Sequence, residues 1–194
     1  MILAVFDTNV LVSSLISKRP DSPTVRVVES IYENRIIPLY NKDIILEYED
    51  VLRREKFGLK EEHVQQLLST IKKLGISIGE PSPTGVELTD SGDVVFYEVT
   101  MEKRDDNAYL ITGNIRHFPH RDYIVTPAEM MEILSLSERD NILNSSLGTD
   151  KLQDDEWLLT NNEGKPSVKK TLRYYSDLIK DKEKTDREDN DLDL

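Results

Sequence analysis

Four polar side chains have types and positions that could hold a divalent cation. Asp7 follows the apolar run of residues 1–6, Glu47 lies within a predicted helix, Asp93 stands where a loop enters a helix, and Asn114 follows a late strand. Carboxylates brought together repel and shift one another's pKa values, which costs stability unless a cation lies among them. Oxygen ligands suit Mg²⁺ or Mn²⁺, and the chain has no cysteine for a softer metal.

Asp7 is open to two interpretations. The apolar run before it and the apolar spacing after it predict a buried strand that feeds a helix. In open α/β sheets ligands bind at the carboxyl ends of the strands, so Asp7 there would face a crevice. Asp is also a preferred helix cap, and capping alone would explain the residue.

Hydrophobic spacing predicts strands that alternate with helices as far as residue 134. Asn41 is placed to cap one helix, Gly75 to end another, and Thr126 and Glu129 to form a capping box. Predicted strands cover residues 1–6, 36–40, 76–78, 108–111 and 123–125. Predicted helices begin near residues 8, 24, 41, 94 and 127, and a further helix has its apolar positions at 64–74. The alternation predicts a three-layer α/β/α fold with a mostly parallel central sheet.

Residues beyond 134 differ in character from those before. We expect a domain at residues 1–134, a partly helical C-terminal extension at 135–180, and an acidic, disordered tail at 181–194. Apolar residues spaced for one face predict an amphipathic helix over 168–179. The segment around Trp157 is interpreted as extra packing on the domain.

The composition limits the classes of protein that the chain can represent. No apolar run is long enough to span a membrane, and the first residues lack the basic leader and cleavage site of a signal peptide. With no cysteine, a cytoplasmic protein that does not associate with membranes is expected. The formal net charge of −12 means that any contact with nucleic acid must be local or bridged by cations.

Four short motifs in order resemble the PIN-domain family, over residues 1 to about 134. They are Phe-Asp-Thr-Asn-Val-Leu-Val-Ser at 6–13, Ile-Leu-Glu-Tyr-Glu-Asp-Val-Leu at 45–52, Asp-Ser-Gly-Asp-Val-Val-Phe at 90–96, and Leu-Ile-Thr-Gly-Asn at 110–114 with His-Phe-Pro at 117–119. The resemblance is to the branch that holds toxin components of toxin–antitoxin pairs, the VapC-like ribonucleases.

The resemblance implies a Mg²⁺- or Mn²⁺-dependent RNA endonuclease, the toxin of a type II toxin–antitoxin pair. Its partners would be an RNA substrate, a cognate antitoxin protein and a second copy of the chain. Asp7, Glu47 and Asp93 match the metal-binding carboxylates of the family. Asn114 stands where a fourth catalytic residue is often Asp, and its lack of charge would weaken a second metal site.

The remaining site residues and their competitors follow from the same motifs. Asn9 and Thr112 match polar residues that support the site in the family. Two further acidic residues compete for the same roles. Glu47 is preferred over Glu49 because Tyr48 follows it, and Asp93 over Asp90 because of the spacing to Phe96.

Two other functions remain as hypotheses. A catalytically weak PIN-like module could act by binding a protein partner, which the apolar face predicted at 168–179 suggests. A phosphatase with Asp7 as nucleophile ranks last, because the haloacid dehalogenase-like pattern needs a second aspartate where this chain has Asn9.

The three histidines receive little weight. His63 is interpreted as a surface residue of a helix. His117 and His120 flank a predicted crevice loop with Arg116 and Arg121, where a phosphate contact is the less favoured interpretation.

Overall fold

The first strand, β1 (Ile2–Phe6), lies at the centre of the sheet. In this computed structural model, residues 1–146 are described. β1 pairs with β2 (Ile36–Tyr40) on one side and with β4 (Tyr109–Ile111) on the other. β3 (Ile76–Ser77) and β5 (Ile124–Val125) complete the order β3-β2-β1-β4-β5, and every pairing is parallel. The carboxyl ends of β1 and β4 are therefore neighbours.

The helices of the described residues are α1 (Thr8–Ile16), α2 (Pro23–Tyr32), α3 (Lys42–Leu52), α4 (Glu61–Leu74), α5 (Val94–Met101) and α6 (Pro127–Ser146). Helices α1 to α5 connect the first four strands, a 3₁₀ turn lies between β4 and β5, and α6 follows β5. Short 3₁₀ turns lie at Glu55–Phe57, Ser91–Asp93, Arg104–Asp106 and Ile115–His117.

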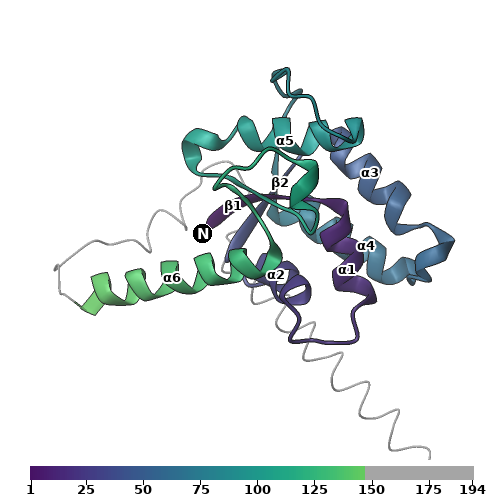
Figure 1. The fold of residues 1–194 in the computed structure, drawn as a ribbon. Helices are drawn as coiled ribbons and strands as arrows, with labels where there is room; N and C mark the ends of the chain where they lie inside the picture. Colours follow the sequence, from purple (N-terminus) through teal and green to yellow (C-terminus); the bar gives the residue numbers. More distant parts are fainter. Residues whose placement is uncertain (147–194) are drawn as a thin grey trace, which may run out of the picture. The chain divides into compact units, whose positions relative to one another are not determined.

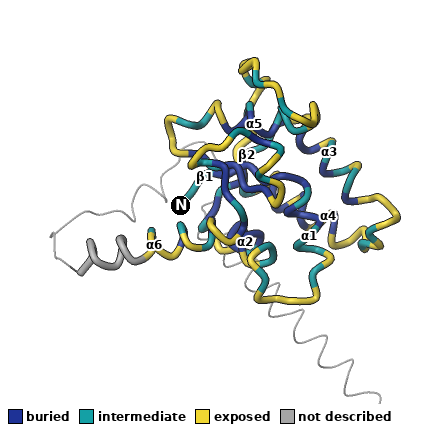
Figure 2. Tube along the Cα trace, viewed as in Figure 1, coloured by how far each residue is buried: buried dark blue, intermediate teal, exposed yellow. Residues whose placement is uncertain are grey.

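Helices cover both faces of the sheet. α5 contacts β1, β2 and β4, whereas α2 and α4 contact β2, and Figure 1 shows α5 and α2 on opposite sides of the sheet. Except for β3, whose two residues are exposed, the strands are accordingly among the most buried segments (Figure 2). A strand covered on both faces needs apolar side chains at successive positions, which explains the unbroken run in β1.

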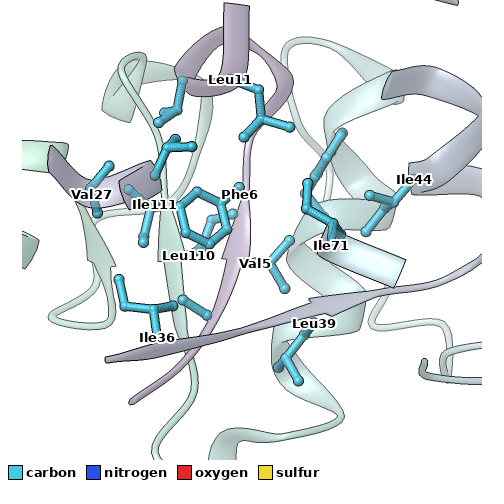
Figure 3. Packing of buried hydrophobic residues seen from close by; sticks show 14 of the residues in the cluster. Val5, Phe6, Leu11, Val27, Ile36, Leu39, Ile44, Ile71, Leu110 and Ile111 are labelled. Carbon is cyan, nitrogen blue, oxygen red and sulfur yellow. The ribbon is translucent and has the colours of Figure 1, made fainter. Parts of the chain in front are cut away.

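The core forms where side chains of the strands meet those of the helices. Phe6 and Leu110 from the strands pack near Leu11, Val27 and other buried helix residues (Figure 3). Burial at about 25 cal/mol per Å² of apolar surface makes this cluster the main stabilising contribution to the domain. It also fixes the carboxyl ends of β1 and β4, which Asp7 and Thr112 directly follow.

Side-chain caps fix where several helices begin. Asn41 Oδ1 accepts from the Ile44 N–H at 2.9 Å, which starts α3. At α6 the Glu129 N–H donates to the Thr126 hydroxyl at 3.2 Å, and Glu129 Oε2 accepts from the Thr126 N–H at 2.7 Å. The predicted cap and capping box are confirmed.

The three-layer fold predicted from the sequence is confirmed, and the sheet is parallel throughout the described residues. No helix of that part of the chain is long and apolar enough to cross a membrane.

The chain divides into two compact units, Met1–Leu143 and Asn144–Leu194. α6 continues past Leu134 without a break to Ser146, and of the second unit only the end of this helix is described. The predictions for Trp157, the helix at 168–179 and the tail at 181–194 lie outside the described residues.

Gly75 ends α4 where the chain passes against β2. A Cβ on Gly75 would lie 2.5 Å from the carbonyl oxygens of both Ile71 and Pro38, which are backbone atoms that cannot move aside cheaply. We expect Gly75→Ala to lower the free energy of unfolding by about 2 kcal/mol, the typical cost of overpacking. Urea unfolding measures it, with Gly79→Ala, whose Cβ would meet nothing within 4 Å, as the control. Equal stability of the two variants would contradict this expectation.

Candidate active site

Asp7 leaves the end of β1 and turns the chain into α1. Its Oδ1 accepts from the Asn9 N–H at 3.1 Å, so Asp7 caps the helix. Its Oδ2 accepts from Asn9 Nδ2 and from the Thr112 hydroxyl, both at 2.6 Å. The side chain is therefore held at the carboxyl edge of the sheet, where it caps α1, and its role in binding a ligand stays a prediction. The cap uses one lone pair of Oδ1, and a second remains for a ligand.

Asn9 and Thr112 tie Asp7 to the neighbouring strand. While Asn9 Nδ2 donates to Asp7, Asn9 Oδ1 accepts from the Gly113 N–H at 3.0 Å. Thr112 is fully buried at the end of β4, and its hydroxyl also accepts from the Asn114 N–H at 2.9 Å. The two polar residues thus fix the turn after β1 against the turn after β4. The structure brings both into contact with Asp7, in the supporting position expected from the sequence motifs.

Glu47 reaches the same edge from α3. Its Oε1 accepts from the Thr8 hydroxyl at 2.6 Å, which joins α3 to the first turn of α1. The next residue, Tyr48, is buried, and its hydroxyl donates to the carbonyl oxygen of Phe6. Burial raises the pKa of Tyr48 well above its ordinary value, so the hydroxyl stays a donor. The Tyr48 anchor sets the rotation of α3 about its axis and thereby places Glu47.

Asp93 stands at the start of α5 and contacts a histidine. Its Oδ2 lies 2.9 Å from His117 Nδ1, and 15% of the Asp93 side chain is exposed. Asn114 Nδ2 lies 2.9 Å from His117 Nε2 and 3.4 Å from Nδ1. From the sequence alone, His117 received little weight. The motif His-Phe-Pro close behind Asn114 was the available indication, but spacing alone could not show which ring nitrogen meets which carboxylate.

The two acidic competitors differ in where they lie. Glu49 Oε1 accepts from Lys72 Nζ of α4 at 2.9 Å and lines a cleft of about 450 Å³ between α3 and α4, to which Glu47 does not contribute. Asp90 is exposed, and its Oδ1 accepts from the Gly92 N–H at 2.9 Å. Its charge nevertheless helps to raise the pKa values of Glu47 and Asp93, so Asp90 lies near the same acidic groups. The geometry separates Glu49 from these groups, and the preference for Asp93 over Asp90 stays a prediction.

The three carboxylates influence one another electrostatically. Burial raises the pKa of Asp7, the charge of Asp93 raises it further, and the hydrogen bonds from Thr112 and Asn9 oppose the rise. Burial also raises the pKa of Glu47, against the Thr8 hydrogen bond, and the charges of Asp7 and Asp93 add to it. Burial raises the pKa of Asp93 despite the His117 contact. The ionised form of each group is therefore destabilised by its surroundings.

The free acceptor atoms show how the site fits a cation. In the hydrogen bonds of residues 1–146, Glu47 Oε2 and Asp93 Oδ1 accept none, and Asp7 Oδ1 accepts only one. Such oxygens suit a hard divalent ion. Within the described part of the chain, however, no three acidic or histidine side chains already lie close enough together to hold a metal. The donor set fits Mg²⁺ or Mn²⁺, and the side chains would have to close around the ion.

A basic segment follows Asn114 directly. Arg116 and Arg121 are exposed, and neither forms an ion pair among the salt bridges of the described residues. His120 and His63 are also exposed. Although the exposed Asp122 follows Arg121, the two arginines supply the local positive charge that a polyanionic ligand would need in a chain of net charge −12.

Comparison with known proteins places this fold in one family. A family model described as a PIN domain matches residues 4–116, which is more than half of the chain and includes Asp7, Glu47, Asp93 and Asn114. No curated protein matches the chain. The match and the five-stranded parallel sheet together establish that the chain belongs to the PIN-domain family.

Proposed function

We propose that the protein is a Mg²⁺- or Mn²⁺-dependent RNA endonuclease. Membership of the PIN family supports the coarser part of this proposal, because PIN domains are generally nucleases, which are hydrolases of nucleic acid, and typically use divalent metals. The choice of RNA as the substrate follows the resemblance of the motifs to the VapC-like branch. The same resemblance supports a role as the toxin of a type II toxin–antitoxin pair.

The proposal of a metal site rests on the pKa values of the three carboxylates at the carboxyl edge of the sheet. Asp7, Glu47 and Asp93 each have a raised pKa, and the charge of one carboxylate adds to the rise in another. A cation among them would remove this penalty and stabilise the ionised forms. Asp7 Oδ1, Glu47 Oε2 and Asp93 Oδ1 would hold it, because each is the oxygen of its carboxylate that accepts the fewer hydrogen bonds.

When bound, a divalent ion supplies a polarised phosphate oxygen and an activated water for attack on phosphorus. The protein's own residues then have defined tasks. Thr112 and Asn9 hold the Asp7 carboxylate still, and Thr8 holds that of Glu47. Arg116 and Arg121 are placed to bind backbone phosphates on the side of Asn114, which would offset the repulsion of RNA by the acidic chain.

Cleavage with and without metal tests the proposal. The full chain, purified and treated with EDTA, is incubated with labelled single-stranded RNA, and then with Mn²⁺ or Mg²⁺ added back. We expect cleavage only with the metal, and internal cuts rather than loss from one end. Metal-independent cleavage, or none under either condition, would contradict the proposed chemistry. Single-stranded DNA of the same sequence tests the preference for RNA.

The toxin role has its own test. Induced expression of the chain should arrest bacterial growth, and co-expression of the product of a small adjacent reading frame should relieve the arrest. We propose that the antitoxin is the product of this adjacent reading frame. We also propose that the protein itself is cytoplasmic and forms a homodimer, as the family resemblance suggests. If the protein cleaves RNA but its expression does not affect growth, it would be a ribonuclease that does not act as a toxin.

A catalytically weak binding module is the second candidate. In residues 1–146 no three ligands are already arranged around a metal position, and Asn114 has no charge. A stable complex with a protein partner, together with the absence of Mn²⁺-dependent cleavage, would favour this function. The helix predicted at 168–179, which suggested it, lies outside the described residues.

A further inference from the structure

We propose that His117 is a positioning residue for the Asp93 carboxylate, and that Asn114 acts through the His117 ring rather than as a ligand of the metal. This role rests on the proposed function, because positioning Asp93 matters only if Asp93 helps to hold an ion. His117 lies just beyond residue 116, where the match to the family model ends.

His117 holds the Asp93 carboxylate directly. His117 Nδ1 and Asp93 Oδ2 are 2.9 Å apart, and an ionised carboxylate can only accept, so Nδ1–H is the donor. Asp93 has no side-chain capping bond to α5 and follows an irregular segment of Gly, Pro, Ser and Thr. In the hydrogen bonds of the described residues His117 is the one side chain that holds the Asp93 carboxylate. With Oδ2 held in this way, Oδ1 stays free for a ligand.

Asn114 lies against the ring of His117. Its Nδ2 lies 2.9 Å from Nε2 and 3.4 Å from Nδ1 of His117. An atom so close to both nitrogens cannot lie along the lone-pair direction of either one in the plane of the ring. The amide therefore packs over the ring face. It restrains the tilt of the imidazole and leaves the in-plane direction of Nε2 clear.

Together these contacts form one path between two carboxylates. The Thr112 hydroxyl donates to Asp7 Oδ2 at 2.6 Å and accepts from the Asn114 N–H at 2.9 Å. Asn114 contacts the His117 ring, and His117 donates to Asp93. The path joins the end of β1 to the start of α5 through the turn after β4. It therefore sets the separation of Asp7 and Asp93, which a shared ion requires to be fixed.

Two conservative variants separate positioning from direct action on RNA. In His117→Asn the amide nitrogen takes the place of Nδ1 and can still donate to Asp93, but nothing takes the place of Nε2. In His117→Gln the longer amide reaches the position of Nε2 instead. His117→Ala removes both donors. The exposed His63→Ala is the control for loss of a histidine.

The readout is the affinity for Mn²⁺ alone, measured by electron paramagnetic resonance on metal-free full-length protein, followed by kcat and KM for RNA. We expect His117→Ala to weaken Mn²⁺ binding about 10-fold, the lower end of the effect of losing a partner of a metal ligand. His117→Asn should restore most of the affinity and kcat, and His117→Gln should not. Rescue by Gln alone, or unchanged Mn²⁺ affinity in His117→Ala, would overturn the proposal.

A double-mutant cycle tests the part played by Asn114. If Asn114 acts through His117, Asn114→Ala should weaken Mn²⁺ binding in the wild-type background and add little in His117→Ala. Additive losses would mean that Asn114 contacts the ion by itself, against the proposal. Failure of the proposed function is distinguishable, because absence of RNA cleavage would leave the effect of His117→Ala on Mn²⁺ affinity measurable, whereas failure of the metal site itself would leave wild-type protein unable to bind Mn²⁺. In that case NMR detection of Nδ1–H on His117, and its loss in Asp93→Ala, would still report the contact.

Discussion

Replacing Asp7 by Asn is expected to lower the rate of RNA cleavage by at least about 100-fold, which exceeds the usual cost of losing a mere supporting partner of a metal site. Asn keeps the size of Asp and is an equally good helix cap, so the bond from the Asn9 N–H and the start of α1 should persist. What is lost is the negative charge among the acidic groups, together with the hydrogen bonds that Asp7 Oδ2 accepts from Asn9 Nδ2 and Thr112, because an amide has one acceptor oxygen. The loss of activity would then come from the site and not from the fold.

The same substitution should remove one source of pH dependence from the stability of the metal-free protein. The pKa of Asp7 is raised in the folded chain, so the folded state binds the proton more tightly than the unfolded state. The contribution of Asp7 to stability is therefore present below the unfolded pKa and is lost as the pH rises through the folded pKa. Asp7→Asn has no ionisable group at this position, so it should lack this loss of stability.

Thermal unfolding of both proteins over pH 4 to 7, in EDTA and in Mn²⁺, measures this. In EDTA the Tm of wild type should fall by a few degrees relative to that of Asp7→Asn between pH 4 and pH 7. The hydrogen bonds lost in the variant shift its Tm at every pH and so do not affect this trend. Saturating Mn²⁺ should raise the Tm of wild type more than that of the variant. A Tm difference that stays constant with pH, or that changes in the opposite direction, would mean that ionisation of Asp7 does not destabilise the folded state.

Exchanging Glu47 for Gln should lower cleavage by about 100-fold or more, whereas Glu49→Gln should leave it within about 2-fold of wild type. The two residues are neighbours on α3 but contact different elements. Glu47 accepts from Thr8 beside Asp7, and Glu49 accepts from Lys72 of α4. Removing the charge of Glu49 costs a partly exposed ion pair, worth less than about 1 kcal/mol.

Single-turnover cleavage at saturating Mn²⁺, with circular dichroism to verify folding, compares these variants. Asp93→Asn and Asp90→Asn make a second pair, in which the first should lose activity and the second should retain most of it. Equal losses in both members of a pair would indicate a general effect of charge. Retained activity in Glu47→Gln would remove Glu47 from the proposed site.

The fold could be predicted from the sequence because the information that specifies its elements is local. A run of apolar residues from Ile2 to Phe6 indicates a strand covered on both faces, and Asn41, Gly75 and Thr126 mark helix ends through their own backbone and capping preferences. Their positions in the structure agree, with β1 central and the sheet parallel. The family motifs added the order of Asp7, Glu47, Asp93 and Asn114 along the chain.

Contacts across long stretches of sequence could be decided only by the tertiary structure. Spacing could not show that the Thr112 hydroxyl meets Asp7, 105 residues away, or that Glu47 meets Thr8 while Glu49 meets Lys72. Nor could it show that the ring of His117 lies between Asp93 and Asn114.

The sequence by itself therefore determined which strands and helices form and where along them the acidic residues lie, because apolar period and capping depend on neighbours along the chain. The packing of the helices on the sheet decided how those ends meet, because the rotation of α3 and the register of β1 with β4 set which side chains face each other. Asp7 shows both contributions. Its place after a buried strand can be predicted from the sequence, whereas its hydrogen-bond partners come from the residue that follows β4 and from the first turn of α1.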